Sequence, residues 1–261
     1  MRVISMSKKQ DLIFGINPVL ETLKASSQDL LEILVSEGSS RPALHLVRQE
    51  ARRRGVRLLS VGSKTLDHLV RGQRHQGVIA RVQAYRYLSF ADLIERIGGP
   101  STPERILILD GLTDPRNFGA LLRTADGAGV RNIVIPKDRS VDVTPVAMKA
   151  SAGAARHVNI VKVTNLRRAI AGLKGHGYWV IGLDAKSKDT IYETSFPQRL
   201  AILVGNEGTG ARPINLRECD LTVSIPMLGK VSSLNVSVAG AVCLYELLRQ
   251  ARKSMTDVSV S

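Results

Sequence analysis

The chain has 261 residues, a length that suits one large domain or two smaller ones. Lys and Arg number 37 against 23 acidic residues, for a net charge of +14, and no apolar run approaches the roughly 18 residues of a membrane span. This composition excludes an integral membrane protein. It predicts a polyanionic partner, because cations that neutralise phosphates release counterions.

The excess of base extends along the whole chain: residues 1–100 carry 16 basic and 9 acidic side chains, and residues 101–261 carry 21 and 14. We therefore expect a nucleic acid as the partner, with a soluble basic protein that lacks one as the alternative. Aromatic residues make up only 4%, which favours contacts to the nucleic-acid backbone over stacking on bases. Cys219 and Cys243 lack the spacing of a disulfide framework or a zinc site, and the first residues do not resemble a secretory signal. We expect a cytoplasmic protein without a metal.

Residues 11–84 have the pattern of a small α/β domain, after a flexible start at 1–10. Apolar segments predict strands at 30–35, 57–61 and 77–82, and amphipathic segments predict helices at 18–24, 42–55 and 66–70. Arg52, Arg53 and Arg54 crowd the end of the second of these helices. Cations there favour the helix dipole, and they equally suit a phosphate-binding patch. A linker is expected at 85–103, because glycines and prolines interrupt the pattern at 98–103.

Residues 104–253 alternate short apolar strands with helices, before a flexible tail at 254–261. We expect strands at 106–109, 132–135, 157–163, 178–183, 200–204 and 221–225, and helices at 118–128, 145–150, 166–173 and 235–252. This alternation predicts a parallel sheet covered on both faces. Ligands of such sheets bind at the carboxyl ends of the strands, where three loops of unusual polar content should meet.

The first of these loops leads from Asp110 into a helix that contains Arg123. Asn117 is expected to cap that helix. Arg123 follows six residues later, roughly 9 Å along the helix axis. The alternative to a functional Arg123 is a solvated side chain that pairs with Asp126, three residues further on.

The second loop, 205–213, has three glycines after a buried strand, so its backbone can approach a ligand closely. It is not a phosphate-binding P-loop, because Ala211 and Arg212 stand where Lys and Ser or Thr are required. Glu207 brings a negative charge to the middle of the loop, which argues against phosphate contact there. A carboxylate on a surface turn is the alternative reading of Glu207.

The third loop follows the strand that ends at Ile225 and leads into a helix that is apolar nearly all round. Polar residues crowd the start of this helix: Ser232, Ser233, Asn235 and Ser237. Such residues can cap the helix by satisfying its free N–H groups, and they can also line a ligand site. Taken alone, this segment favours capping.

Together, the three loops resemble the three motifs of the SpoU family of RNA ribose 2′-O-methyltransferases, in order and in spacing. The matching segments are Asp110…Asn117-x5-Arg123, Val204-Gly205-Asn206-Glu207-Gly208, and Ser224-Ile225-Pro226-Met227 with Ser232-Ser233-Leu234-Asn235-Val236-Ser237. The segments Phe14-Gly15-Ile16-Asn17-Pro18-Val19 and His75-Gln76-Gly77-Val78 are similar to the family's amino-terminal RNA-recognition domain. The resemblance covers nearly the whole chain and is closest to the bacterial 23S ribosomal RNA guanosine 2′-O-methyltransferase branch.

The resemblance implies an α/β fold of the SPOUT class. Its carboxyl-terminal parallel-sheet domain would contain a deep trefoil knot, and a small domain similar to ribosomal protein L30e would precede it. It also implies S-adenosylmethionine as the cofactor, RNA as the substrate and a homodimer. In the family the cofactor contacts mainly backbone, at positions that match Gly205, Ile225 and Leu234; Val204 and Met227 adjoin them. The expected RNA-binding residues are Arg52, Arg53, Arg54 and Arg116.

The implied reaction moves a methyl group from a sulfonium to a ribose 2′-hydroxyl, a weak nucleophile that needs help with its proton or its developing charge. The family's catalytic residues fall on Arg123, Asn117, Glu207, Ser233 and Asn235. A guanidinium releases a proton only at great cost, so we favour Arg123 as a phosphate clamp and oxyanion stabiliser over Arg123 as the base. Asn117, Glu207 and Asn235 would hold Arg123 and the loops, and Ser233 would orient the ribose.

Two other functions are compatible with the sequence. The first is a transfer RNA ribose methyltransferase of the same family; the long amino-terminal domain favours ribosomal RNA over it, by analogy. The second is a non-catalytic RNA-binding protein that keeps the fold, against which the intact motif residues argue. Neither the target nucleotide nor the proton acceptor can be read from the sequence.

Overall fold

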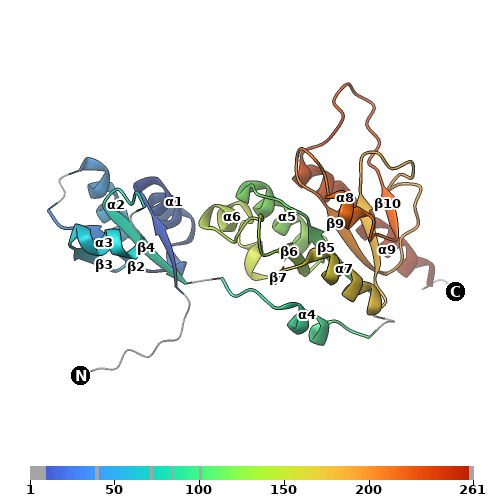
Figure 1. Ribbon diagram of the computed structural model, residues 1–261, viewed down its shortest axis with the longest axis horizontal. Helices are drawn as coiled ribbons and strands as arrows, with labels where there is room; N and C mark the ends of the chain where they lie inside the picture. The colour runs from blue at the N-terminus through green and yellow to red at the C-terminus, as the bar shows by residue number, and fades with distance from the viewer. Residues whose placement is uncertain (1–9, 39–40, 71–72, 84, 100–101, 259–261) are drawn as a thin grey trace. The chain divides into compact units, whose positions relative to one another are not determined.

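The computed structural model describes residues 10–38, 41–70, 73–83, 85–99 and 102–258, and the chain separates into two compact units at Arg86 and Tyr87 (Figure 1). The flexible start predicted at 1–10 lies almost wholly outside the described residues. None of the helices in the described ranges is long and apolar enough to cross a membrane.

The first unit is a four-stranded sheet with helices on both faces. Its elements are β1 (Gln10–Phe14), α1 (Ile16–Ser26), β2 (Leu30–Ser36), α2 (Pro42–Arg53), β3 (Leu58–Val61), α3 (Ser63–Leu69) and β4 (Val78–Gln83), with a short 3₁₀ turn at Ser27–Asp29. The strand order is β1-β4-β2-β3, and only the β2–β3 pair is parallel among these described strands. Side chains of α1 and α2 fill one face, and those of α3 fill the other. Strands and helices alternate in this unit, and its likeness to ribosomal protein L30e stays a prediction.

The second unit is built on a six-stranded parallel sheet. Its elements are α4 (Phe90–Arg96), β5 (Glu104–Leu109), α5 (Pro115–Gly127), β6 (Asn132–Pro136), α6 (Pro145–Ala150), a 3₁₀ turn (Ala154–Arg156), β7 (Asn159–Val163), α7 (Leu166–Gly175), β8 (Trp179–Leu183), β9 (Arg199–Val204), α8 (Pro213–Leu216), β10 (Leu221–Val223) and α9 (Val236–Val258). The strand order is β10-β8-β9-β5-β6-β7, and every neighbouring pair is parallel. The predicted parallel sheet is confirmed. The expected knot stays a prediction.

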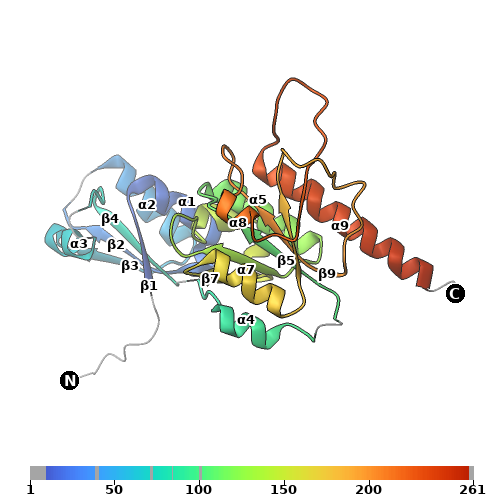
Figure 2. The same ribbon diagram turned by 45° about the vertical axis from the view of Figure 1, so that its right-hand side comes forward.

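Helices cover both faces of this sheet, which is why its strands are apolar without alternation. Alternate residues such as Ile106 and Leu203 pack against α4 and α7. The helices α5 and α9 lie on the opposite face (Figure 2). They approach closely at Gly240, where an added Cβ would lie 2.4 Å from Cδ2 of Leu121.

Two segments differ from the predicted organisation. Most of the expected linker, 85–103, belongs to the second unit: Leu88 forms a bridge to Val161, and α4 buries Leu93 against the sheet. A capping box between Ser89 and Asp92 begins α4, a signal that the sequence carries and that we did not use. The expected flexible tail, 254–261, is helical as far as Val258, because α9 continues past the predicted end.

Candidate active site

The carboxyl ends of β5, β9 and β10 lie at one edge of the large sheet, because the strands in the order β10-β8-β9-β5 are all parallel. The three polar loops leave the sheet at this edge, as Figures 1 and 2 show for the segments after β9 and β10. Their convergence, predicted from the alternation of strands and helices, is confirmed.

Asp110 is a buried carboxylate at this edge, directly after β5, and is 1% exposed. It accepts hydrogen bonds from the backbone N–H of Arg212 at 2.8 Å, from Nε of Arg212 at 2.7 Å and from Nδ2 of Asn215 at 2.8 Å. These donors offset the cost of burying the charge. Asp110 therefore anchors α8 to the end of β5. We assigned it no role from the sequence, although an acidic residue directly after an apolar strand needs such partners.

The turn after β9 is held in one shape by its own backbone and by Asn206. A Cβ at Gly205 would lie 1.8 Å from the backbone nitrogen of Ala211, so glycine is required there. Oδ1 of Asn206 accepts hydrogen bonds from the backbone N–H of Gly208 at 3.3 Å and of Thr209 at 3.0 Å. The close backbone approach predicted at this loop occurs between two parts of the loop itself.

Hydrogen bonds join the three loops through the side chains of Asn117, Glu207 and Asn235. Nδ2 of Asn117 donates to Oε1 of Glu207, which is exposed in the turn after β9. Nδ2 of Asn235 donates to Oδ1 of Asn117 at 3.2 Å. Residues from α5, the turn after β9 and the start of α9 thus form one connected group.

Asn117 does not cap its helix, contrary to the prediction. Helix α5 begins earlier, at Pro115, and Oδ1 of Asp114 accepts a hydrogen bond from the backbone N–H of Arg116 at 3.1 Å. Asn117 is the third residue of the helix, so its side chain is free to reach Glu207. At the last helix, by contrast, capping occurs: Oδ1 of Asn235 accepts from the backbone N–H of Ser237 at 2.9 Å. Asn235 therefore both caps α9 and contacts Asn117.

Arg123 and Ser233 lie outside this group. Both side chains are exposed, and neither forms a hydrogen bond or ion pair with another residue in the described part of the chain. The alternative pairing of Arg123 with Asp126 is not formed there either. Arg123 lies on the same face of α5 as Arg116, seven residues earlier and roughly 10 Å away along the axis. Two exposed cations thus share one face of α5.

The expected cofactor residues surround the segment between β10 and α9. Val204 and Gly205 are buried at the end of β9, and Ile225, Met227 and Leu234 are half-buried. The segment 225–235 forms neither helix nor strand, so its backbone N–H and C=O groups are not committed to a ladder. Apolar side chains beside free backbone groups suit an adenine ring, so the residues fit the cofactor that the resemblance implies.

The arginines at the end of α2 differ in their freedom to bind a phosphate. Glu50 accepts from Nε of Arg53 at 3.0 Å and from Nε of Arg54 at 2.6 Å. The hydrogen bond from Arg53, followed in size of effect by that from Arg54, lowers the pKa of Glu50 to about 2. Glu50 is therefore a carboxylate at neutral pH and forms an ion pair with each arginine. Arg52 is exposed, and the structure gives it no such partner among the residues it describes.

Cys219 and Cys243 are both free thiols. Burial raises the pKa of each to about 12, so both are protonated at neutral pH. Within the described ranges, no three His, Cys, Asp or Glu side chains are grouped in a way that could hold a metal ion.

Comparison with known proteins assigns both units. The family model described as "SpoU rRNA Methylase family" matches residues 104–245, and the one described as "RNA 2'-O ribose methyltransferase substrate binding" matches residues 12–88. The 23S rRNA (guanosine-2'-O-)-methyltransferase RlmB of Haemophilus influenzae is 43% identical over 239 residues, which cover 91% of this chain and 97% of that protein.

Solved structures agree with this assignment. The crystal structure of an RNA 2'-O ribose methyltransferase is 29% identical and has a TM-score of 0.58, over 94% of this chain and 90% of that one. The SpoU methyltransferase AviRb from Streptomyces viridochromogenes, in complex with AdoMet, has a TM-score of 0.61 over 93% and 90% of the two chains. Its identity of 23% shows the shared fold alone. On its motifs, its relatives and its fold, the chain belongs to the SpoU rRNA methylase family.

Proposed function

We propose that the protein transfers the methyl group of S-adenosylmethionine to a ribose 2′-hydroxyl of 23S ribosomal RNA, with a guanosine as the target. One observation carries the proposal: the three motif segments meet at one edge of the sheet, joined by the hydrogen bonds among Asn117, Glu207 and Asn235. The relative named for this reaction supports the choice of substrate, since it is 43% identical over 91% of the chain.

The cofactor is proposed to lie between the turn at Gly205 and the segment 225–235. S-adenosylmethionine supplies, when bound, a methyl group on a positively charged sulfur. Ile225 and Leu234 offer half-buried apolar side chains and uncommitted backbone groups, which can enclose and hydrogen-bond an adenine ring. The Asp110 anchor and the Asn206 turn fix the opposite wall before the ligand binds, so little ordering is left to oppose binding.

Arg123 is proposed to act on the RNA as a positive charge. Its side chain is exposed, and a guanidinium releases a proton only at great cost, so it suits an oxyanion stabiliser and a clamp on a neighbouring phosphate better than a base. Arg116, on the same face of α5, is placed to bind a further phosphate of the same strand. Asn117, Glu207 and Asn235 hold α5 and the two loops together, and they act on Arg123 through the position of α5. Ser233 is exposed beside this group and is proposed to orient the ribose.

Substituting Arg123 tests this assignment. Arg123→Ala is expected to abolish methyl transfer to ribosomal RNA while calorimetry shows unchanged binding of S-adenosylmethionine. Arg116→Ala is the matched variant on the same helix face, and it is expected to raise KM for RNA with kcat kept. Normal turnover by Arg123→Ala contradicts the role of Arg123.

The first unit is proposed to bind RNA beyond the target nucleotide. Besides Arg52, Arg53 and Arg54, it offers a cleft of about 600 Å³ that is lined by Arg41 and Arg74. Because Glu50 occupies Arg53 and Arg54, Arg74→Ala is expected to weaken binding of a ribosomal RNA fragment more than Arg53→Ala does. If both variants lose the same affinity for RNA in a filter-binding assay, Arg53 contributes as much to RNA binding as Arg74.

A homodimer is proposed through α9. Val238 is 47% exposed and Tyr245 is 52% exposed, and their spacing of seven residues places them on one helix face. An exposed apolar face suits a second copy of the chain. Sedimentation velocity is expected to give a dimer that Val238→Glu with Tyr245→Glu converts to a monomer. A monomeric unsubstituted protein contradicts this proposal.

Ribosomal RNA also implies the cytoplasm as the place of action, which cell fractionation checks. Transfer RNA is the competing substrate within the family. With S-adenosylmethionine tritiated in the methyl group, the purified protein is expected to label ribosomal RNA from a strain that lacks this protein. The transfer RNA of that strain is expected to stay unlabelled. The reverse pattern reassigns the substrate.

A further inference from the structure

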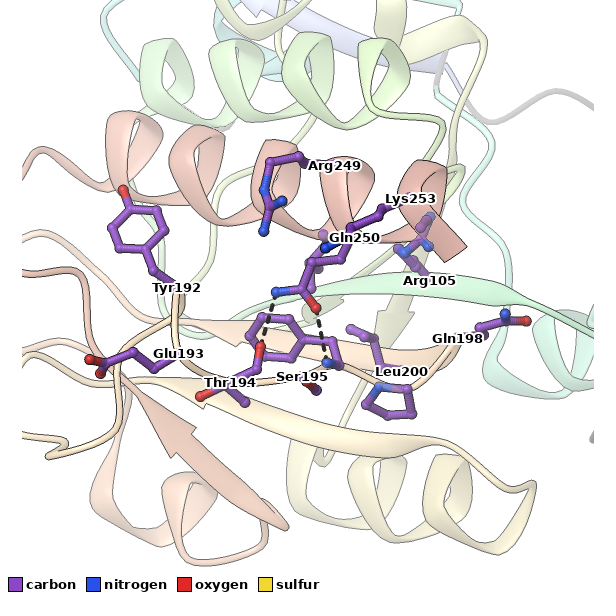
Figure 3. Close-up of a pocket in the computed structure, with 14 residues that line it drawn as sticks. Arg105, Tyr192, Glu193, Thr194, Ser195, Gln198, Leu200, Arg249, Gln250 and Lys253 are labelled. Carbon is purple, nitrogen blue, oxygen red and sulfur yellow. Dashed lines mark hydrogen bonds between the residues drawn. The ribbon is translucent and has the colours of Figure 1, made fainter. Parts of the chain in front are cut away.

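A cavity of about 280 Å³ opens in the second unit at the amino-terminal ends of its strands (Figure 3). Arg105 of β5 and Leu200 of β9, which pair in register, line one side of it. The segment 192–198 and the part of α9 between Leu247 and Lys253 line the rest. Arg105 precedes Asp110 by five residues, so roughly 16 Å of strand, at about 3.3 Å per residue, separate the cavity from the candidate active site. The cavity is therefore a separate feature of the unit.

Arg105 is the cation in this cavity that most needs an anion. Its side chain is half-buried, and burial lowers the pKa of its guanidinium. Among the residues that the structure describes, none accepts a hydrogen bond from it. A desolvated charge without a partner destabilises a fold unless a ligand compensates it.

Two further cations line the cavity from α9. Arg249 donates from Nε and Nη2 to the carboxylate of Glu246, at 2.8 and 2.7 Å, which leaves Nη1 available to a ligand. Lys253, one helical turn later, is exposed and has no acceptor within the described part of the chain. Figure 3 shows Lys253 and Arg105 on the same side of Gln250.

The acidic residue of the lining does not neutralise these cations. The carboxylate of Glu193 accepts a hydrogen bond from the hydroxyl of Thr190 at 2.8 Å. In Figure 3 it points away from the other labelled side chains. The cavity therefore presents an excess of positive charge to whatever enters it.

The wall opposite α9 is fixed before a ligand binds. Gln250 donates from Nε2 to the carbonyl of Thr194 at 2.9 Å and accepts at Oε1 from the backbone N–H of Phe196 at 3.1 Å, bonds drawn in Figure 3. The ring of Tyr192, 54% exposed, lies beside this wall. An aromatic ring in the same cavity as guanidinium and ammonium groups is a combination that binds bases and phosphates of single-stranded RNA.

We propose that this cavity binds a short stretch of single-stranded RNA, with its phosphates held by Arg105, Lys253 and the free Nη1 of Arg249, and one base against Tyr192. The inference rests on the proposed function only in taking RNA as the partner. The cavity would hold the substrate strand at a second point, at the sheet edge opposite the methyl-transfer site. Free phosphate shares part of this chemistry, and the experiment separates the two ligands.

The test measures binding of a fluorescent single-stranded oligouridylate to the full-length protein by anisotropy over a range of KCl concentrations. The plot of log K against log salt has a negative slope, and each lost phosphate contact makes it shallower by roughly 0.7. The double variant Arg105→Gln with Lys253→Gln is therefore expected to make the slope shallower by about 1.4. Arg168→Gln removes an exposed cation of the same unit outside the cavity and is expected to leave the slope unchanged. Tyr192→Leu should weaken binding of the oligonucleotide while leaving the slope unchanged.

Thermal unfolding serves as the folding control. Arg105→Gln is expected to keep or raise Tm, because it removes a half-buried unpaired charge, so weaker binding cannot be ascribed to misfolding. A double variant with the slope of the unsubstituted protein overturns the proposal. A second result also overturns it. If inorganic phosphate raises the Tm of the unsubstituted protein but not of the double variant, while the salt dependence of RNA binding is the same for both, the cavity binds free phosphate and not RNA. Methyl transfer is assayed separately, so its absence would count against the proposed function and leave the binding result intact.

Discussion

The buried carboxylate of Asp110 makes a quantitative prediction about the second unit. Asp110→Asn keeps the size of the side chain and removes its charge. The change turns one acceptor oxygen into an NH₂ group that faces donors. The backbone N–H and guanidinium of Arg212 and the amide of Asn215 then compete for one acceptor.

The expected cost follows from these bonds. Hydrogen bonds to a charged group contribute about 1.5–3 kcal/mol each, and the loss of one partner from a buried pair costs about 3–5 kcal/mol. The side chain of Arg212 is 49% exposed, so its guanidinium regains water and its share is discounted. Most of the cost in free energy therefore comes from the weakened hydrogen bonds of Asn215 and of the backbone N–H of Arg212. We expect a loss of about 3 kcal/mol in the free energy of unfolding, or a Tm lowered by about 6–12 °C.

Urea and thermal denaturation followed by circular dichroism measure this loss. Asp114→Asn is the matched control, because it makes the same chemical change four residues later at a position where asparagine caps a helix as well as aspartate does. It is expected to change stability by less than about 0.5 kcal/mol. Equal stability of Asp110→Asn and Asp114→Asn would contradict the anchoring role of Asp110.

Three further predictions follow from the same site and from the thiols. Gly205→Ala places a methyl group 1.8 Å from the backbone of Ala211, so calorimetry should show S-adenosylmethionine binding weaker by about 2 kcal/mol, roughly thirtyfold; unchanged affinity would contradict the fixed turn. Glu207→Ala removes the acceptor of Asn117 and should lower kcat while KM for RNA stays within about twofold, whereas an effect on KM alone would argue for direct RNA contact. Cys219 and Cys243, each with a pKa raised to about 12, should react slowly with a disulfide reagent at pH 8 and rapidly in denaturant, because the thiolate forms only near and above the pKa. Rapid reaction of both thiols in the folded protein would contradict the raised pKa values.

The sheet could be predicted from the sequence because burial on both faces leaves a readable pattern. Segments such as 106–109 and 200–204 are continuously apolar, which is typical of strands in a covered parallel sheet. The strand order could not be read in the same way. Hydrophobicity indicates which faces of a strand are buried and says nothing of its neighbours, so the position of β8 between β10 and β9 required the structure.

The structure joins Asn117, Glu207 and Asn235, three of the residues that the sequence singled out, by hydrogen bonds that the sequence did not predict, and the catalytic roles stay a prediction. Asn117 looked like a cap because it precedes the apolar Phe118, yet Asp114 followed by Pro115 is the stronger start signal for a helix. Its contacts to Glu207 and Asn235 span 90 and 118 residues, and no local pattern encodes such distances.

The basic residues show which electrostatic conclusions a sequence supports. The net charge predicted a polyanionic partner, which agrees with membership of an RNA methylase family. The net charge does not indicate which cationic side chains are free of ion pairs. Glu50 lies three and four residues before Arg53 and Arg54, a spacing that already indicates pairing. Arg105, in contrast, sits in a strand-forming segment, and only the packing around β5 reveals that it is half-buried without an anion.

Alkaline digestion of labelled RNA tests directly whether the protein transfers the methyl group to a ribose 2′-hydroxyl. Unmodified ribosomal RNA is incubated with the protein and S-adenosylmethionine tritiated in the methyl group, then hydrolysed with alkali. Cleavage needs a free 2′-hydroxyl, so a 2′-O-methylated nucleotide stays joined to its neighbour. We expect tritium in a dinucleotide with guanosine as the 5′ residue. Label released as a mononucleotide, which marks methylation of a base, or no label at all would contradict it.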